Sequence, residues 1–317
     1  MTDKQTNPLL CDTGKGLCVT PGNSAEAAVS TASQNTKPVR IIYFTDPICS
    51  ACWSIEPQLR KLQLEYGAHI EITYHMGGLL PSWDIYNSGG ISKPSDVAHH
   101  WEEMSAYAEM PIDGDVWLED PLNSSYPPSI AFKAAELQDR VKAIKFLRRA
   151  REMVFLEKKN ITKWEYIEQA AIESGLDTTQ LLIDYNGTAQ QLFQEDLRMA
   201  KQYRVRGFPA LYFSDSLNNQ STLYGFKPYE DFERIIQKLS PAISKKAIDT
   251  EGENLFNYYP TLTVKEFSVL SNLSKEAANN MLFELTNKGI IEKNQSKNGA
   301  IWKKKKCGPL TEYLFNF

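Results

Sequence analysis

The sequence predicts an α/β fold that carries a long helical insertion and, near the C-terminus, a small separate unit of two helices and a β-hairpin. Three observations support this prediction. A strand, a CxxC motif, a helix and a second strand follow one another between residues 39 and 76; helical periodicity dominates residues 95–203; and a new pattern of helices and strands begins at residue 264. A chain of 317 residues is long enough to bury a sizeable core.

The first structural unit begins at residue 39. Residues 39–44 (VRIIYF) are apolar, β-branched and aromatic, and the run ends at Asp46 and Pro47, which is typical of a strand. Residues 56–66 repeat leucine with a roughly helical period and stop at Gly67, and residues 70–76 (IEITYHM) alternate like a second strand. This order predicts the opening βαβ unit of a parallel sheet.

The flanking segments differ in composition. Residues 1–38 are small and polar, so we expect a flexible tail that cannot offset the entropy of ordering. After the second strand, helical patterns predict an insertion over about residues 90–203, with Ser95 and Thr162 as N-caps. The domain is expected to span residues 39–240. Its remaining predicted elements are helices at 95–110, 129–138, 143–157, 162–174, 178–203 and 229–239, and strands at 210–213 and 222–226.

The C-terminal part is expected to be a separate unit. A linker with few core residues is predicted at 241–258, a small domain at 259–306 and a tail at 307–317. The small domain combines helices at 264–270 and 274–288 with strands at 290–293 and 300–303, the latter joined by an Asn298-Gly299 turn. Two helices followed by a β-hairpin predict a winged-helix-like domain.

Composition limits the function classes. The net charge of −4 argues against a molecule that binds polyanions over its whole surface. The sequence has no apolar run of membrane-spanning length, and its first residues lack the apolar core of a secretory signal, so we expect a cytoplasmic protein without a membrane partner. Five cysteines are too few for a disulfide scaffold in a chain of this length, which leaves redox chemistry or metal binding.

The cysteines at 49 and 52 are the strongest candidates for chemistry. They lie between the end of a strand and the start of a helix, at a spacing that allows a disulfide. The start of the helix stabilises a thiolate, which makes Cys49 the attacking nucleophile. Cys52, one turn into the helix and more buried, would resolve the mixed disulfide. The alternatives are a buried structural pair or half of a zinc site, although the sequence has no second CxxC to complete one.

Pro209 is a second candidate. It lies in Arg206-Gly207-Phe208-Pro209-Ala210, directly before a predicted strand. A cis Phe208–Pro209 bond would leave the preceding backbone available to pair with an extended peptide, whereas a trans proline would simply open the strand. The residues themselves leave both alternatives open.

Together these features resemble a known family. Residues 46–53 (DPICSACW), the long insertion and residues 207–211 (GFPAL) resemble the DsbA-like thioredoxin superfamily. Within it, residues 131–137 (AFKAAEL) and 300–303 (AIWK) are similar to the cytoplasmic branch of FrnE-type dithiol-disulfide isomerases and SpxH (YjbH) adaptors of the ClpXP protease. The resemblance runs from about residue 39 to 303. It implies a thioredoxin fold, Cys49 as nucleophile, Cys52 as resolving thiol, and Phe208 with a cis Pro209 as the substrate-binding segment.

The sequence also departs from these relatives. DsbA has Pro-His between its cysteines, and Ser50-Ala51 offers no such donor, so a strongly oxidising potential is not expected. SpxH proteins are rich in Cys and His near the N-terminus, where a zinc site has been proposed, but residues 1–38 contain no histidine. We therefore expect neither a metal nor another cofactor.

Two weaker features have alternative interpretations. Cys11 and Cys18 flank a glycine-bearing stretch and are interpreted as a possible accessory redox pair for Cys49 and Cys52, or else as thiols of a tail or partial metal ligands. The C-terminal unit is rich in lysine, but its second helix contains no arginine, so at most it would contact phosphates. Protein docking is the preferred role for this unit and a DNA partner is not expected.

Two functions remain. The first is a cytoplasmic thiol-disulfide oxidoreductase or isomerase that acts on protein dithiols or disulfides. The alternative is a redox-sensitive adaptor that presents a client regulator to the ClpXP protease, with a protease unfoldase as partner. The intact CxxC favours the first.

Overall fold

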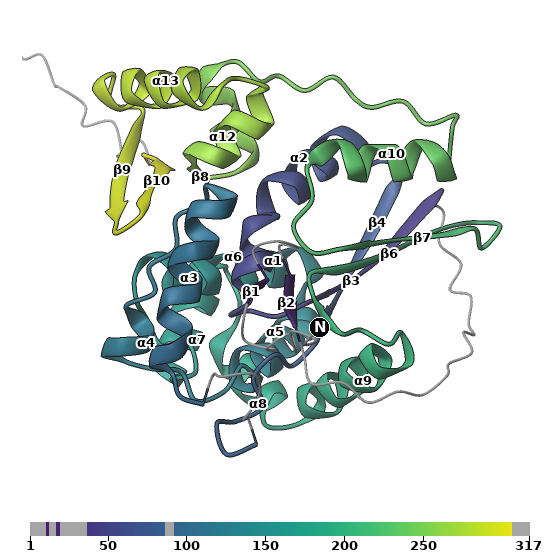
Figure 1. The fold of residues 1–317 in the computed structure, drawn as a ribbon, viewed down its shortest axis with the longest axis vertical. Coiled ribbons are helices and arrows are strands. Elements are labelled where there is room, and N and C mark those ends of the chain that lie inside the picture. The colour runs from purple at the N-terminus through teal and green to yellow at the C-terminus, as the bar shows by residue number, and fades with distance from the viewer. Residues whose placement is uncertain (1–10, 13–16, 20–36, 86–91, 306–317) are drawn as a thin grey trace, which may run out of the picture.

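The computed structural model of the protein describes residues 11–12, 17–19, 37–85 and 92–305. Figure 1 shows a central sheet with helices on both faces and a C-terminal unit at one end of the molecule. Within the described ranges, no helix combines the length and the apolar composition that crossing a bilayer requires.

The central sheet has four strands in the order β4-β3-β6-β7. β3 (Val39–Thr45) pairs in parallel with β4 (Ile70–Met76) and antiparallel with β6 (Ala210–Asp215). β6 in turn pairs antiparallel with β7 (Gln220–Tyr224). As a central strand β3 is covered on both faces, which explains why its sequence is apolar almost throughout. The predicted βαβ unit is therefore confirmed.

Two short helices connect β3 to β4. α1 (Ser50–Ser54) is a single turn, and α2 (Glu56–Tyr66) follows it after Ile55. Pro57 lies in the first turn of α2, where it lacks the N–H that would continue the α1 hydrogen-bond ladder. The proline thus separates a short turn, which carries the CxxC, from the longer helix predicted at 56–66.

Helices cover the sheet on both faces. α2 and α10 (Tyr229–Leu239) form one apolar layer with the sheet, in which Ile41, Leu62 and Phe232 are buried together. α5 (Tyr126–Gln138) and α9 (Thr188–Gln202) lie on the opposite side (Figure 1). The second layer is continuous with the core of the insertion and with both cysteines of the CxxC.

The insertion is helical as predicted, with different boundaries. Thr178 to Tyr203 was expected to be one helix, but the structure has α8 and α9, because Gly187 leaves helical geometry between them. The predicted caps Ser95 and Thr162 are wrong, since neither side chain caps a helix; aspartates cap α6 and α8 instead. The other helices are α3 (Ser95–Ala108), α4 (Val116–Glu119), α6 (Arg140–Leu156), α7 (Trp164–Glu173) and α8 (Thr178–Tyr185).

The C-terminal unit has its own apolar core. α12 (Val264–Ser271) and α13 (Lys275–Asn287) pack on an antiparallel sheet of β8 (Thr261–Thr263), β10 (Gly299–Lys304) and β9 (Ile291–Ser296), in that order. η1 (Gly252–Asn254) and α11 (Leu255–Tyr258) belong with it, because Leu255 and Phe256 are buried in this core. The expected linker at 241–258 is therefore too long at its C-terminal end. Assignment of the unit to the winged-helix class stays a prediction.

Part of the expected N-terminal tail is paired into a sheet. β1 (Cys11–Asp12) pairs with β2 (Leu17–Val19), and β2 pairs with β5 (Gly207–Phe208), both antiparallel. The tail prediction is wrong for these five residues, because the otherwise unpaired backbone of β5 offers an edge to which a strand can add. The rest of residues 1–36 and residues 306–317, with Cys307, lie outside the described residues.

Candidate active site

The loop between β3 and α1 places Cys49 at the start of a helix. Cys49 is the N-cap of α1, with extended backbone, and its Sγ accepts the backbone N–H of Cys52 at 3.1 Å. Upstream, the Asp46 carbonyl accepts the N–H of Cys49, and the Asp46 carboxylate accepts the N–H of Ile48. The sulfur therefore lies where the positive end of the helix and an N–H donor both favour a thiolate.

Both cysteines of the motif are fully covered. Cys49 and Cys52 have 0% exposure and lie in one apolar cluster with Trp53 and Phe208. The prediction that Cys52 would be the more buried of the two is wrong, since they are equally buried. β2 lies against α1, so the N-terminal strands contribute to this covered environment.

A buried arginine lies beside the thiol pair. Arg151 on α6 donates to Thr45 Oγ1 at 2.6 Å and to the Asp46 carbonyl at 3.2 Å, and it pairs with Glu56 at 2.5 Å. Burial works to lower the pKa of Arg151, but its negative neighbours, which include the thiolate forms of both cysteines, raise it above its ordinary range. A positive charge is thus held permanently near the sulfurs.

Tyr43 on β3 completes the polar surroundings of Cys52. Its hydroxyl accepts a hydrogen bond from Thr45 Oγ1 at 3.0 Å. Burial raises the pKa of Tyr43 well above its ordinary value, and the negative charge of Cys52 raises it further. The phenol therefore remains protonated as a neutral neighbour of the thiol pair.

Asp46 fixes the loop before Cys49. Besides Ile48, its carboxylate accepts the N–H of Leu79 at 2.7 Å and the hydroxyl of Ser125 at 2.8 Å. Burial raises the pKa of Asp46 to about 6, although these hydrogen bonds and Arg151 act in the opposite direction. The carboxylate ties the CxxC loop to the insertion and titrates close to neutral pH.

The segment across from the CxxC has the geometry that the family resemblance implies. The Phe208–Pro209 bond is cis, which confirms that prediction. The Phe208 ring is buried against Gly77, where an added Cβ would come within 1.8 Å of the ring. The ring is therefore core, and only the backbone of residues 207 and 208 is available for pairing. In this structure β2 takes that position, with Cys18 opposite Phe208.

The other predicted pair also comes together. Cys11 and Cys18 are directly opposite each other in the β1–β2 pairing. Because β2 lies against α1, the backbone brings the predicted accessory pair to the same side of the molecule as Cys49 and Cys52. The predicted redox role of Cys11 and Cys18 stays a prediction.

Sequence reasoning missed Arg151, Tyr43 and Asp46. A signal for Arg151 was present, since it falls four residues from Leu147 and from Phe155, on the stripe of the helix that is otherwise apolar and buried. A charge in such a stripe is buried only when it is paired. Nothing comparable distinguishes Tyr43 in an apolar strand.

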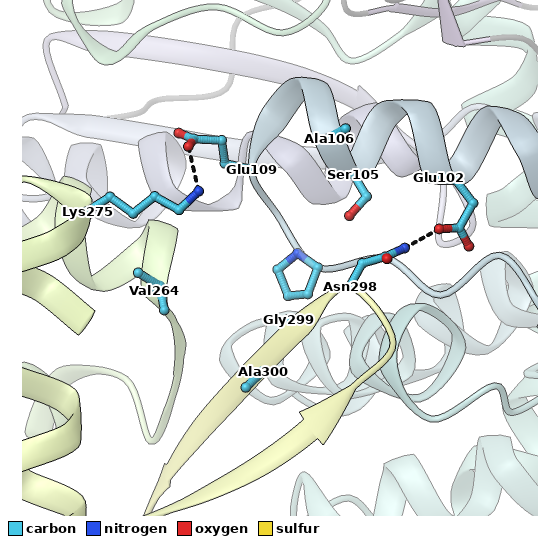
Figure 2. Close-up of a pocket in the computed structure, with 10 residues that line it drawn as sticks. Glu102, Ser105, Ala106, Glu109, Val264, Lys275, Asn298, Gly299 and Ala300 are labelled. Atoms are coloured by element: carbon cyan, nitrogen blue, oxygen red, sulfur yellow. Dashed lines mark hydrogen bonds and ion pairs between the residues drawn. The ribbon is translucent and has the colours of Figure 1, made fainter. Parts of the chain in front are cut away.

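A concave region lies between α3 and the C-terminal unit. The cavity has a volume of about 380 Å³. Figure 2 shows Lys275 reaching Glu109 and Asn298 reaching Glu102 beside it. At Gly299 the backbone has a φ of +145°, and an added Cβ would come within 3.1 Å of Pro111, so glycine permits the close approach of β10. The region joins the two parts of the chain.

Carboxylates near this cavity could in principle hold a cation. Ligand atoms of Glu102, Asp113 and Asp115 lie within 4.8 Å of one another. Lys297 from the C-terminal unit pairs with Asp115 at 2.7 Å and with Glu102 at 3.1 Å. The chain's own ammonium group thus serves as the counter-ion of this group, and we assign no metal to it.

Comparison with known proteins agrees with this geometry. A thioredoxin family model matches residues 43–234. The ClpXP adapter protein SpxH of Halalkalibacterium halodurans is 31% identical over 306 residues, which are 95% of this chain and 98% of that protein. SpxH of Bacillus subtilis is 30% identical over 84% of this chain and 89% of that protein.

Two solved structures are similar in fold. A putative protein disulfide isomerase from Nitrosomonas europaea aligns with a TM-score of 0.55 and 19% identity, over 64% of this chain and 97% of its own. The cytosolic disulfide reductase DsbM from Pseudomonas aeruginosa aligns with a TM-score of 0.52 and 20% identity, over 63% of this chain and all of its own. The fold is therefore thioredoxin-like, with the helical insertion that the sequence predicts.

Proposed function

This chain belongs to the SpxH family of ClpXP adapter proteins, and from that membership and the geometry of its site we propose that it is a ClpXP adaptor whose Cys49–Cys52 pair exchanges disulfides with protein thiols. The observation that carries the exchange activity is Cys49 at the start of α1, with Cys52 in reach and Arg151 beside both. We place the protein in the cytoplasm, as its sequence predicts.

The adaptor role is supported by the extent of the similarity. SpxH of Halalkalibacterium halodurans matches 95% of this chain, whereas the DsbM structure aligns with only 63% of it. Lysines of that unit pair with acidic groups of the insertion, as Lys265 and Lys275 do with Glu109. Because these lysines serve internal contacts, we propose a protein client and an unfoldase as partners and no DNA partner.

The exchange chemistry follows from the arrangement of the two sulfurs. The Cys49 thiolate attacks one sulfur of a client disulfide, a Cys49–client disulfide forms, and the other client sulfur leaves as a thiolate that takes a proton. Cys52 then loses its proton and attacks Cys49, which releases the second client thiol and leaves a Cys49–Cys52 disulfide. The client gains two electrons, and the reverse sequence oxidises a client dithiol.

A turnover assay tests the exchange activity. The purified chain should reduce the disulfides of insulin when a dithiol reductant is supplied, and Cys49→Ser should abolish this activity. Cys307→Ser is the matched control and should retain full activity, because residue 307 has no role in the proposal. If wild type and Cys49→Ser reduce insulin at the same rate, the exchange activity is refuted.

Protein turnover in cells tests the adaptor role. Removal of the chain should lengthen the half-life of at least one protein in pulse-chase proteomics, and this effect should vanish when ClpX is also absent. The purified chain should then accelerate degradation of that protein by ClpXP. Unchanged half-lives throughout the proteome would refute the adaptor role and leave the exchange activity as the function.

A further inference from the structure

The N-terminal strands occupy the place where a peptide would bind beside the cis-proline. β5 is only two residues long and ends directly before Pro209, and it is paired with β2 rather than with the central sheet. The register is antiparallel, with Cys18 opposite Phe208 and Val19 opposite Gly207. Addition of an extended segment to such an edge is the β-augmentation mode of peptide recognition, here satisfied by the chain itself.

The same arrangement brings cysteines together. β2 lies against α1, the helix that begins after Cys49, and β1 lies near α3. Cys11 is directly opposite Cys18, and opposed residues of antiparallel strands have Cα separations of about 4.5–5.5 Å, which fall within the range of disulfides. Four of the five cysteines of the chain therefore lie on elements that contact one another.

We propose that β1 and β2 act as a built-in substrate, occupying the peptide-binding edge at β5 and exchanging a Cys11–Cys18 disulfide with Cys49 and Cys52. The position of Cys18, opposite Phe208, is where the reactive cysteine of a bound client would stand. This inference rests on the proposed exchange activity, and it adds that activity toward any other protein requires β2 to leave β5.

The internal exchange balances without an outside reactant. The Cys49 thiolate attacks the sulfur of Cys18, the Cys18–Cys49 bond forms, and the Cys11–Cys18 bond breaks with Cys11 leaving as a thiolate that takes a proton. Cys52 gives up its proton, attacks Cys49 and releases Cys18 as a thiol. Two electrons and two protons thus pass from the Cys49–Cys52 dithiol to the Cys11–Cys18 disulfide, and the reverse reaction restores it.

Trapping of the intermediate tests the exchange. The full chain with both Cys11→Ser and Cys52→Ser lacks the two thiols that could break a Cys18–Cys49 bond. After reduction and treatment with oxidised glutathione we therefore expect a Cys18–Cys49 disulfide as the main product in peptide mass spectrometry. The same chain with Cys18→Ser added should instead retain a Cys49–glutathione disulfide. Cys307→Ser added to Cys11→Ser and Cys52→Ser is the control and should still give the Cys18–Cys49 product.

The outcomes separate this inference from the proposed function. If Cys49 in the chain with Cys11→Ser and Cys52→Ser carries glutathione and is not joined to Cys18, the built-in substrate is refuted while the exchange activity stands. If Cys49 reacts neither with glutathione nor with Cys18, the exchange activity itself is refuted, and the inference falls with it.

A proline substitution tests the occupation of the edge. Val19 pairs with Gly207 and has no partner on β1, so Val19→Pro weakens the β2–β5 contact and leaves the β1–β2 pairs in place. We expect insulin reduction to rise about threefold or more, and amide exchange of residues 207–208 to accelerate. Arg140→Pro, at the first position of α6 where proline is tolerated, should change neither. Faster amide exchange without faster insulin reduction would refute the occupied edge.

Discussion

At the scale of single residues, the site depends on charges that are buried and paired. Arg151 is fully buried, yet it carries its charge because Glu56, a backbone carbonyl and a hydroxyl surround it. An arginine in this position cannot lose its proton, so its field acts on the sulfurs of Cys49 and Cys52 at every physiological pH. The reactivity of the thiol pair is thereby linked to a residue on the inserted helix α6.

Arg151→Gln should slow alkylation of Cys49 at pH 7 by about tenfold, because loss of a nearby positive charge lowers the thiolate fraction by about that factor. Arg151→Lys should recover part of the rate, since it restores the charge without the planar set of donors. Iodoacetamide labelling followed by mass spectrometry measures the rate.

Arg149→Gln is the matched control for this experiment. Arg149 is on the same helix and also pairs with carboxylates, but its partners Glu157 and Glu173 are at the surface. Cys49 of the Arg149→Gln variant should be alkylated at the same rate as Cys49 of the wild type. Equal slowing in Arg149→Gln and Arg151→Gln would show that the effect comes from the helix and not from the charge beside the sulfurs.

The raised pKa of Asp46 predicts that the free energy of unfolding changes with pH over a specific range. Burial raises its pKa from 3.8 to about 6, so the folded state holds this proton more tightly than the unfolded chain does. The stabilisation of the folded state by this bound proton is complete below about pH 3.8 and is lost as the pH rises to about 6. The free energy of unfolding falls by roughly 2–3 kcal/mol over this range. Asp46→Asn does not titrate. The difference in unfolding free energy between wild type and variant should therefore fall over this range, as measured by urea denaturation at several pH values. Parallel curves for the two proteins would contradict the assignment.

The site residues that the sequence predicts differ in one respect from those that it does not predict. Cys49, Cys52 and Pro209 belong to short motifs that can be recognised locally. Arg151 lies about a hundred residues from the loop it stabilises, and its contact with Asp46 exists only once the insertion has folded over the sheet. Pairings of this kind depend on tertiary packing, which no local pattern encodes.

At the scale of elements, the end of β4 determines where β5 can lie. Gly77 follows β4, and the Phe208 ring occupies the space that any other side chain at 77 would need. The position of β5, and of Pro209 next to it, is therefore set by the glycine that directly follows β4.

Gly77→Ala should destabilise the protein by about 1–3 kcal/mol, because the added methyl group overlaps the buried Phe208 ring and forces it to move. A smaller side chain in the double variant Gly77→Ala with Phe208→Leu should recover part of the loss. Thermal unfolding measures both effects. If the double variant is less stable than Gly77→Ala by the full cost of Phe208→Leu alone, the two residues are not coupled and the explanation fails.

The elements that the sequence predicted well are those with strong periodicity. The strands and helix of residues 39–76 lie where they were expected, because a central strand and an amphipathic helix have clear patterns. The break at Gly187 was missed because the apolar spacing continues through it. β1 and β2 were missed because their pairing depends on the edge of β5 and not on their own composition.

At the scale of the whole molecule, alternating charges connect the CxxC site to the C-terminal unit. Arg151 pairs with Glu56, which lies 3.8 Å from Arg60 and 3.9 Å from Arg148. Both arginines then pair with Glu266 of the C-terminal unit, Arg148 through two hydrogen bonds of 2.7 and 3.0 Å and Arg60 at 3.0 Å. These ion pairs attach the C-terminal unit to the domain that carries the CxxC.

Glu266→Gln should weaken this attachment by about 2–4 kcal/mol, since Arg60 and Arg148 would be left buried without a full counter-charge. The pKa of Glu266 is lowered by the two arginines despite its burial, so the wild-type group stays ionised. Limited proteolysis within residues 241–258 should become faster, and the thermal midpoint should fall.

Glu276→Gln provides the comparison for this variant. Glu276 is also in the first turn of a helix of the C-terminal unit, but it is exposed and makes no ion pair with the thioredoxin-like domain among the described residues. Its proteolysis rate and thermal midpoint should match those of the wild type. Wild-type behaviour of Glu266→Gln as well would show that the attachment does not depend on these charges.

Trp53 has a consequence for chimaeric proteins. Its indole N–H donates to the Pro111 carbonyl at 3.0 Å, its ring stacks on Phe155, and Arg148 lies over it at 4.4 Å. A graft that moved the CxxC loop into another thioredoxin scaffold would carry this indole without its acceptor, at a cost of about 1–3 kcal/mol for a buried donor left unsatisfied. Recombination between relatives should therefore succeed only when the loop, the 110–115 segment and α6 are inherited from the same parent.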